Sequence, residues 1–214
     1  MNSGSAGSLM EKLKESTRAM HDSAEASAFQ GKLTNGALPK ELYVLYLEQL
    51  YLVHRKLEEC IKQCAQQDAK FSAIVSSEQL QEPFLKLDLQ SFNRNIEAIQ
   101  PLSSTTELLN YMEELSKTYA PALLGMHYVL LGSKHGGKFV AKNCQESYQL
   151  NASAGAKYFD PYGQNFMPIW KDFKESMNQL SLEDGEEEQF CGAAAKMFLA
   201  VTKIGNELMP KAKI

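Results

Sequence analysis

One short stretch near the N-terminus places a cation, an imidazole and a carboxylate along one helical face. Lys14 lies seven residues before His21, and Glu25 lies four residues after it. Spacings of four and seven residues bring side chains to the same side of a helix. A neutral imidazole can ligate a metal through one nitrogen while the other donates to an acceptor, and Glu25 is placed to be that acceptor. An ordinary surface triad on an amphipathic helix explains the same pattern, and from this helix alone it is the simpler interpretation.

A second unusual feature is the segment 132–137, which holds three glycines in six residues inside a stretch that is otherwise typical of one helix. A glycine in a helix interior costs roughly 1 kcal/mol relative to alanine, so the segment predicts a break or a bend. At 100° per residue, Gly125, Gly132 and Gly136 share one face, which is bordered by the side chains of Tyr128, Val129 and Phe139. Such a flat face suits a large planar ligand.

The histidine and the glycines together favour one kind of iron site. Di-iron bundles use Glu-x-x-His pairs, and none of the four histidines has an acidic residue three positions before it. Haem is a planar cofactor whose iron accepts a single proximal imidazole, and its propionates favour a cation such as Lys14. Cys60 and Cys64 share a helix face, but no second metal-binding pair accompanies them, so we interpret them as small buried hydrophobes.

The elements that must position these residues are helices. Apolar side chains recur with helical spacing and no alternating pattern of useful length appears, so the predicted class is all-α. A chain of 214 residues with 44% hydrophobic content predicts a single domain over 9–208, with a disordered segment 1–8 and a tail 209–214. We expect helices over 9–28, 41–66, 82–99, 105–116, 120–146, 165–179 and 186–208. The acidic run 183–188 is expected to cap the start of the last helix.

Charge and terminal composition exclude several classes of partner. The net charge is −4, and the 22 lysines and arginines are interleaved with 26 acidic residues, which argues against nucleic acid. Neither terminal segment has the composition of a signal peptide or a membrane anchor. Four scattered cysteines are too few for a disulfide framework and favour a reducing compartment. We therefore expect a cytoplasmic protein without a membrane anchor, and a monomer.

Two strings of residues resemble a known family. The segment 13–25, which contains His21 and Glu25, resembles the proximal helix of haem oxygenases, in which a glutamate follows the proximal histidine by four residues. The segment 125–133, with the glycines that follow it, is similar to the distal helix of the bacterial members. Further downstream, the spacing matches the segment that closes the pocket in that group, at Gly155, Tyr158, Phe159, Tyr162, Gly163, Trp170 and Phe173. The resemblance spans about 9–208 and implies a helical bundle with haem between a proximal and a kinked distal helix.

The resemblance also implies an activity. Haem oxygenases cleave haem b to biliverdin, carbon monoxide and ferrous iron, using O2 and electrons from a separate reductase or ferredoxin. The implied metal ligand is His21, with Glu25 as its hydrogen-bonded partner. The other implied haem contacts are Lys14, Tyr128, Gly132, Gly136 and Lys174, of which Gly132 and Gly136 are distal backbone contacts and Lys14 and Lys174 approach the propionates. A solvated lysine is an equally good interpretation of Lys174.

The departures from the family pattern leave a second function open. Mammalian relatives carry an aspartate where this chain, like the bacterial relatives, has Ser133; a serine cannot hold charge, so a water chain for proton delivery would need another anchor. On a straight helix Lys134 points to solvent, His127 turns away from the haem and His135 lies at the edge of the glycine face. If His135 ligated the iron, a haem-binding transport, storage or sensor protein would be favoured over an enzyme. His54, among apolar neighbours, is most simply structural.

Overall fold

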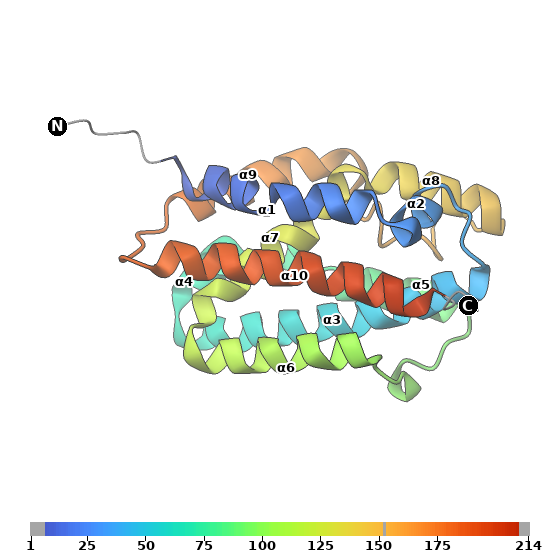
Figure 1. The fold of residues 1–214 in the computed structure, drawn as a ribbon, viewed down its shortest axis with the longest axis horizontal. Helices are drawn as coiled ribbons and strands as arrows, with labels where there is room; N and C mark the ends of the chain where they lie inside the picture. The colour runs from blue at the N-terminus through green and yellow to red at the C-terminus, as the bar shows by residue number, and fades with distance from the viewer. Residues whose placement is uncertain (1–6, 152, 210–214) are drawn as a thin grey trace.

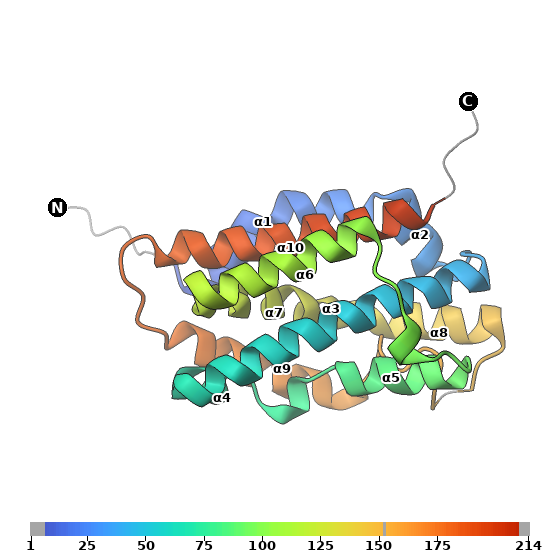
Figure 2. The same cartoon turned by 90° about the horizontal axis from the view of Figure 1, so that it is seen from below.

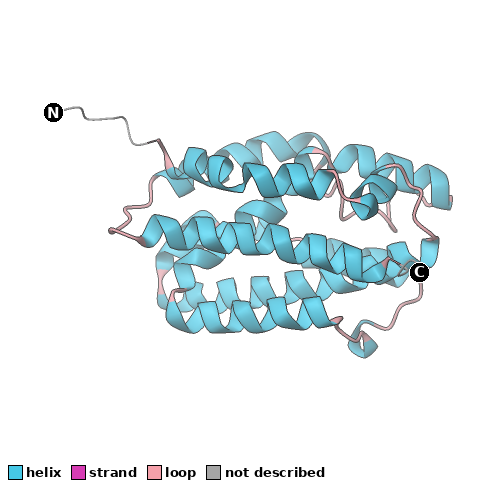
Figure 3. Cartoon of the chain, in the orientation of Figure 1, coloured by secondary structure: helices cyan, strands magenta, loops and turns pink. Residues whose placement is uncertain are grey.

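The computed structural model describes residues 7–151 and 153–209, and every regular element within those ranges is a helix (Figures 1 and 3). The predicted all-α class and single domain are confirmed, since the buried apolar side chains form one continuous core. The α-helices of the described residues are α1 Leu9–Glu25, α2 Ala28–Thr34, α3 Lys40–Gln67, α4 Ala69–Ile74, α5 Glu82–Ser91, α6 Ser103–Thr118, α7 Leu123–Gly132, α8 Gly137–Tyr148, α9 Phe166–Asn178 and α10 Glu186–Leu208.

Local capping chemistry sets the two ends of α1. Ser8 and Glu11 form a capping box in which the Ser8 hydroxyl accepts from the Glu11 amide while the Glu11 carboxylate accepts from the Ser8 amide. Ser8 is therefore part of the ordered fold, although the expected disordered segment included it; residues 1–6 and 210–214 lie outside the described residues. The helix ends at Glu25, three residues before the prediction, because the Ser27 side chain caps a separate helix by accepting from the Gln30 amide.

Two predicted helices are interrupted. The helix expected over 82–99 ends at Ser91, because Asn93 adopts a left-handed conformation with φ of 55° and turns the chain. The stretch 120–146 is divided into α7 and α8 by a 3-10 turn at Ser133–His135, so the break predicted from the glycines is confirmed. The last helix begins at Glu186 and ends at Leu208 as predicted, with three glutamates in its positive first turn.

The long C-terminal helix organises the bundle. α10 lies between α1 and α6 and also packs along α7, while α3 packs against α5 and α6 (Figures 1 and 2). The start of α1 is tied to the end of α9, because the Met10 amide donates to Asn178 Oδ1 at 3.1 Å. These contacts hold α1, α7 and α9 around the same part of the bundle, and these helices carry all of the candidate site residues except Ser133 and Gly136, which lie in the turn after α7.

The cysteines agree with their interpretation as small hydrophobic side chains. All four thiols are free, and Cys60, Cys64 and Cys144 are buried in the core. Among the described residues, none of the helices combines the length and the hydropathy needed to cross a bilayer.

Candidate functional site

His21 projects from the exposed face of α1 with both of its ring nitrogens near a carboxylate. Its side chain is 54% exposed, and Nε2 lies 3.7 Å from Glu25 Oε1 while Nδ1 lies 3.7 Å from Asp22 Oδ1. These distances are too long for hydrogen bonds, so the imidazole is accessible and only loosely oriented. The structure thus places Glu25 beside His21 as the spacing predicts, and adds Asp22 as a second carboxylate. The Phe198 ring of α10 packs edge-on against the imidazole at 5.9 Å.

The glycines of the distal segment serve different purposes. A Cβ at Gly125 would lie 2.4 Å from the Phe190 carbonyl oxygen, and a Cβ at Gly137 would lie 1.9 Å from the Phe159 carbonyl oxygen. Both glycines therefore permit close backbone packing, and the prediction that Gly125 belongs to the ligand-facing surface is wrong. At Gly136 a Cβ would meet nothing within 4 Å, and at Gly132 it would touch the Trp170 ring at 3.4 Å. Gly136 therefore presents exposed, side-chain-free backbone at the turn, whereas Gly132 is half-buried against the Trp170 ring.

Aromatic rings lie around Gly132. The His135 ring packs edge-on against Trp170 at 5.0 Å and against Phe166 at 4.7 Å, and its Nδ1 lies 2.8 Å from the Gly132 carbonyl oxygen. Tyr128 lies 5.7 Å from Trp170 between ring centroids. Burial raises the pKa of Tyr128, and a hydrogen bond with Thr17 of α1 partly opposes that rise. Tyr128 therefore connects the distal helix α7 to the proximal helix α1.

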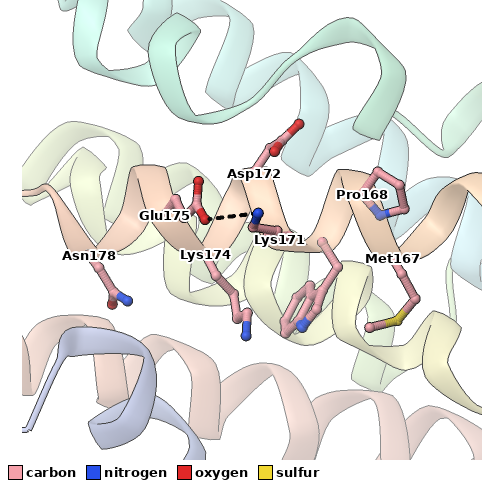
Figure 4. A pocket seen from close by; sticks show the side chains of 8 residues that line it. Met167, Pro168, Lys171, Asp172, Lys174, Glu175 and Asn178 are labelled. Carbon is pink, nitrogen blue, oxygen red and sulfur yellow. Dashed lines mark ion pairs between the residues drawn. The ribbon is translucent and has the colours of Figure 1, made fainter.

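A hollow of about 760 Å³ runs along α9 beside these rings. Figure 4 shows Met167, Lys174 and Asn178 on the same side of the helix, while Asp172 points the other way. Lys174 therefore faces the hollow that Trp170 also lines. Lys14 is exposed and lines a different hollow on α1, with Glu11, Glu15 and Arg18. The structure does not bring the two candidate propionate contacts together in one hollow.

Behind the distal turn lies a buried polar cluster that the sequence analysis missed. His54 Nδ1 lies 3.3 Å from Glu58 Oε1, and His54 Nε2 lies 3.1 Å from the Tyr158 hydroxyl. The His54–Glu58 spacing of four residues is the same signal that singled out His21 and Glu25, and it was available in the sequence. His54 is buried and hydrogen-bonded, so its role in the structure goes beyond packing among apolar neighbours.

Lys134 is also part of this cluster, and the prediction that it faces solvent is wrong. Its side chain is buried, and its Nζ lies 3.2 Å from the centroid of the Tyr158 ring. The segment 155–158 covers it, because the buried Asp88 carboxylate accepts backbone N–H bonds from Gly155, Lys157 and Tyr158. Burial lowers the pKa of Lys134 well below its usual value, and the Asp88 charge only partly opposes this.

Burial and hydrogen bonding set the charge states around His54. Burial lowers the pKa of His54, and the neighbouring Lys134 lowers it further, while Glu58 opposes the shift. Although burial works against it, the pKa of Glu58 is lowered by hydrogen bonds from His54 and from the amides of Gln81 and Glu82. Glu58 is therefore an anion at neutral pH. His127 is buried, and its Nε2 lies 3.0 Å from Gln79 Oε1.

Comparison with known proteins agrees with this arrangement. Residues 7–207 match the family model described as Heme oxygenase. The chain belongs to the haem oxygenase family. It is 26% identical to Heme oxygenase 1 from Gallus gallus, in an alignment that covers 96% of this chain and 76% of that protein. The structure of heme oxygenase from Leptospira interrogans matches with a TM-score of 0.86 and 25% identity, over 94% of this chain and 100% of that one.

A cyanobacterial member of the family was solved with its ligand. Heme oxygenase-1 from Synechocystis, in complex with heme, has a TM-score of 0.85 to this chain over 94% of its length, at 23% identity. At that identity the likeness shows the fold alone. This chain's own residues nevertheless fit a haem: α1 offers an accessible imidazole at His21, and the distal turn offers open backbone at Gly136.

Proposed function

We propose that this protein is a haem oxygenase that cleaves haem b to biliverdin, carbon monoxide and ferrous iron, using O2 and electrons from a separate reductase or ferredoxin. Two observations carry the proposal in a chain that belongs to this family: α1 has an accessible imidazole at His21, and the distal turn has side-chain-free backbone at Gly136. Haem, when bound, supplies the iron that activates oxygen and the porphyrin that is cleaved.

Each candidate residue then has a defined task. His21 would ligate the iron through one ring nitrogen, and the carboxylate beside the other nitrogen, Glu25 or Asp22, would accept a hydrogen bond from its N–H, which would fix the ring and its tautomer. Gly132 and Gly136 allow the backbone of the distal turn to approach the haem face. Ser133 is exposed at the same turn and offers a hydroxyl there.

Side chains at the edge of the site orient the cofactor. Lys174 faces the hollow along α9 and supplies a cation for a propionate, and Lys14 supplies a second cation from α1. Tyr128 contributes an aromatic wall where α7 meets α1. An electron-donor protein is the partner that the reaction requires.

A second function is favoured by one specific observation. His135 lies beside Gly132 and is exposed, with its Nδ1 turned to the Gly132 carbonyl oxygen and its Nε2 left for other partners. If His135 coordinated the iron opposite His21, the protein would hold haem for transport, storage or sensing and would not destroy it. A six-coordinate bis-histidine site slows oxygen binding because the distal position is already filled.

One experiment separates the two functions. Hemin is added to the purified protein, ascorbate or a reductase is supplied in air, and the Soret band is followed. The enzyme consumes its haem, so the Soret band is lost and a broad red absorption grows; a stable spectrum would refute the enzyme. The variants His21→Ala and His135→Ala form a matched pair. We expect His21→Ala to lose the native ferric spectrum and His135→Ala to keep it, and the reverse result would transfer the ligand role to His135.

A further inference from the structure

The distal turn, residues 133–136, packs against the segment 155–158 through a buried lysine. The Lys134 side chain is 5% exposed, and its Nζ lies 3.2 Å from the centroid of the Tyr158 ring. The next lysine along the chain, Lys138, is exposed. When the distal turn is closed over the Tyr158 ring, it therefore holds an amine away from water.

The segment on the other side of this contact is firmly held. The buried Asp88 carboxylate of α5 accepts N–H bonds of 2.6–2.9 Å from the amides of Gly155, Lys157 and Tyr158. The Tyr158 hydroxyl lies 3.1 Å from His54 Nε2 of α3. Because two helices hold the segment, a separation between Lys134 and the Tyr158 ring requires movement of the distal turn.

The distal turn is built in a way that makes such a movement inexpensive. Ser133–His135 is a single 3-10 turn, which has poorer hydrogen-bond geometry than an α-helix, and two glycines follow it. The Phe139 amide then donates to the Gly136 carbonyl oxygen at 3.2 Å. Glycine loses more backbone entropy on ordering than any other residue, so it regains the most when a turn unwinds. Unwinding of the turn and of the start of α8 lifts Lys134 from the ring.

Closing the turn leaves the Lys134 amine without a hydrogen-bond acceptor. Among the residues that the structure describes, no atom accepts a hydrogen bond from Nζ. The Asp88 carboxylate already accepts from three amides, and its charge opposes only part of the fall in the Lys134 pKa that burial causes. The face of the Tyr158 ring attracts the amine but is a weaker partner than an oxygen. The hydration of the amine is therefore not fully replaced when the turn closes.

We propose that the buried Lys134 amine opposes closure of the distal turn, so that the turn opens and admits haem to the exposed backbone at Gly136. Closure is favoured by the close packing of Gly137 against the Phe159 carbonyl group, and the amine offsets part of that packing. When the turn lifts, the amine reaches water while the Tyr158 ring stays in place. The admission of haem rests on the proposed function, whereas the opening of the turn does not.

The size of the effect follows from the missing hydrogen bond. A buried donor without an acceptor shifts an equilibrium against burial by roughly 5- to 150-fold. The Tyr158 ring returns part of this, so we expect the lower part of the range, about 10-fold, for the equilibrium between the open and closed turn.

The test uses one variant and one matched control in the full chain. Lys134→Met removes the amine and keeps an unbranched apolar side chain that packs well on an aromatic ring. Lys138→Met makes the same change at an exposed lysine one turn further along. Hydrogen exchange of the Phe139 amide, followed by NMR without haem, measures opening of the turn, and the Tyr158 amide bound to Asp88 is the internal reference. The rate of hemin capture is measured by stopped-flow absorbance in the Soret band.

We expect the Phe139 amide to exchange about 10-fold more slowly in Lys134→Met than in the wild type, and hemin capture to slow by a similar factor. Lys138→Met should match the wild type in both, and the Tyr158 amide should exchange at the same rate in all three proteins. Unchanged or faster exchange of the Phe139 amide in Lys134→Met would overturn the proposal, because the amine would then be neutral toward closure or favour it. A Lys134→Met protein that does not fold would overturn it for the same reason.

The hemin measurement separates the two parts of the inference. Slower exchange with unchanged hemin capture would overturn the admission of haem by the turn. A wild type that does not bind hemin would overturn the proposed function and the admission of haem together, and hydrogen exchange would still decide whether the amine opposes closure.

Discussion

Adjacent glycines at the distal turn should respond in opposite ways to the same substitution. Gly136 has φ of −92° and ψ of −7°, a conformation that alanine adopts without strain, and a Cβ there would meet nothing within 4 Å. Gly137 is buried, and a Cβ there would lie 1.9 Å from the Phe159 carbonyl oxygen and 2.9 Å from the carbonyl carbon. The comparison of Gly136→Ala with Gly137→Ala therefore isolates the effect of close backbone packing.

The expected magnitudes follow from those distances. At Gly136 the added methyl restricts the unfolded chain and costs nothing in the folded one, so Gly136→Ala should raise the free energy of unfolding by about 0.4–1 kcal/mol. At Gly137 the opposing atom is backbone, which cannot rotate away, so α8 and the segment around Phe159 must separate. Overpacking of this kind costs about 3 kcal/mol, the upper part of the usual range. For a chain of this size that loss lowers the melting temperature by roughly 6–12 °C.

Urea and thermal unfolding of the haem-free proteins, followed by circular dichroism, measure both changes. The wild type provides the reference, and the difference between the two variants should be about 3–4 kcal/mol in the free energy of unfolding. Equal stability of Gly136→Ala and Gly137→Ala would refute the argument that Gly137 is required by the approach of Phe159. It would also remove the division between packing glycines and site glycines on which the candidate site depends.

Two further predictions concern the site and the pH dependence of folding. Trp170 is the one tryptophan in the sequence and lies against Gly132. Hemin bound at the distal turn should therefore quench the tryptophan fluorescence. If saturating hemin left the fluorescence unchanged, the ligand would bind elsewhere. Burial lowers the pKa of His127 from 6.5 to about 4, so the unfolded chain binds the proton more tightly than the folded protein does. The free energy of unfolding should therefore fall by on the order of 3 kcal/mol as the pH falls from about 6.5 to 4. Urea unfolding of His127→Gln should show a smaller loss over that range, and an identical loss would contradict the assignment.

Helical periodicity and punctuation predicted much of the fold. The helix expected over 41–66 is found at Lys40–Gln67, because a long amphipathic pattern follows Pro39. The last helix is found at its predicted ends, because Gly185 and the glutamates after it mark its start. The short helices α2 and α4 were missed, and the helix over 82–99 was predicted too long. Their ends depend on single residues such as Ser27 and Asn93, whose local conformation the periodicity does not reveal.

Local spacing in the sequence predicted only part of the candidate site, as His54 shows. Two histidines have a glutamate four residues later, and the pattern alone does not distinguish them. His21 is accessible because the face of α1 that carries it is not covered, whereas His54 is buried because Tyr158, more than one hundred residues later, packs onto it. The same four-residue spacing thus gives an accessible imidazole in α1 and a buried, hydrogen-bonded histidine–glutamate pair in α3.

The sequence by itself determined that the chain is helical, that the glycine segment interrupts a helix, and that His21 and Glu25 share a face, because each of these depends on residues within a few positions of one another. Tertiary structure decided which glycines are open and that Lys134 is buried. Asp88 binds the backbone of segment 155–158 and places Tyr158 over Lys134, so the exposure that a straight helix predicts is reversed. Solvent exposure depends on which distant segments pack together, and that information is absent from local spacing.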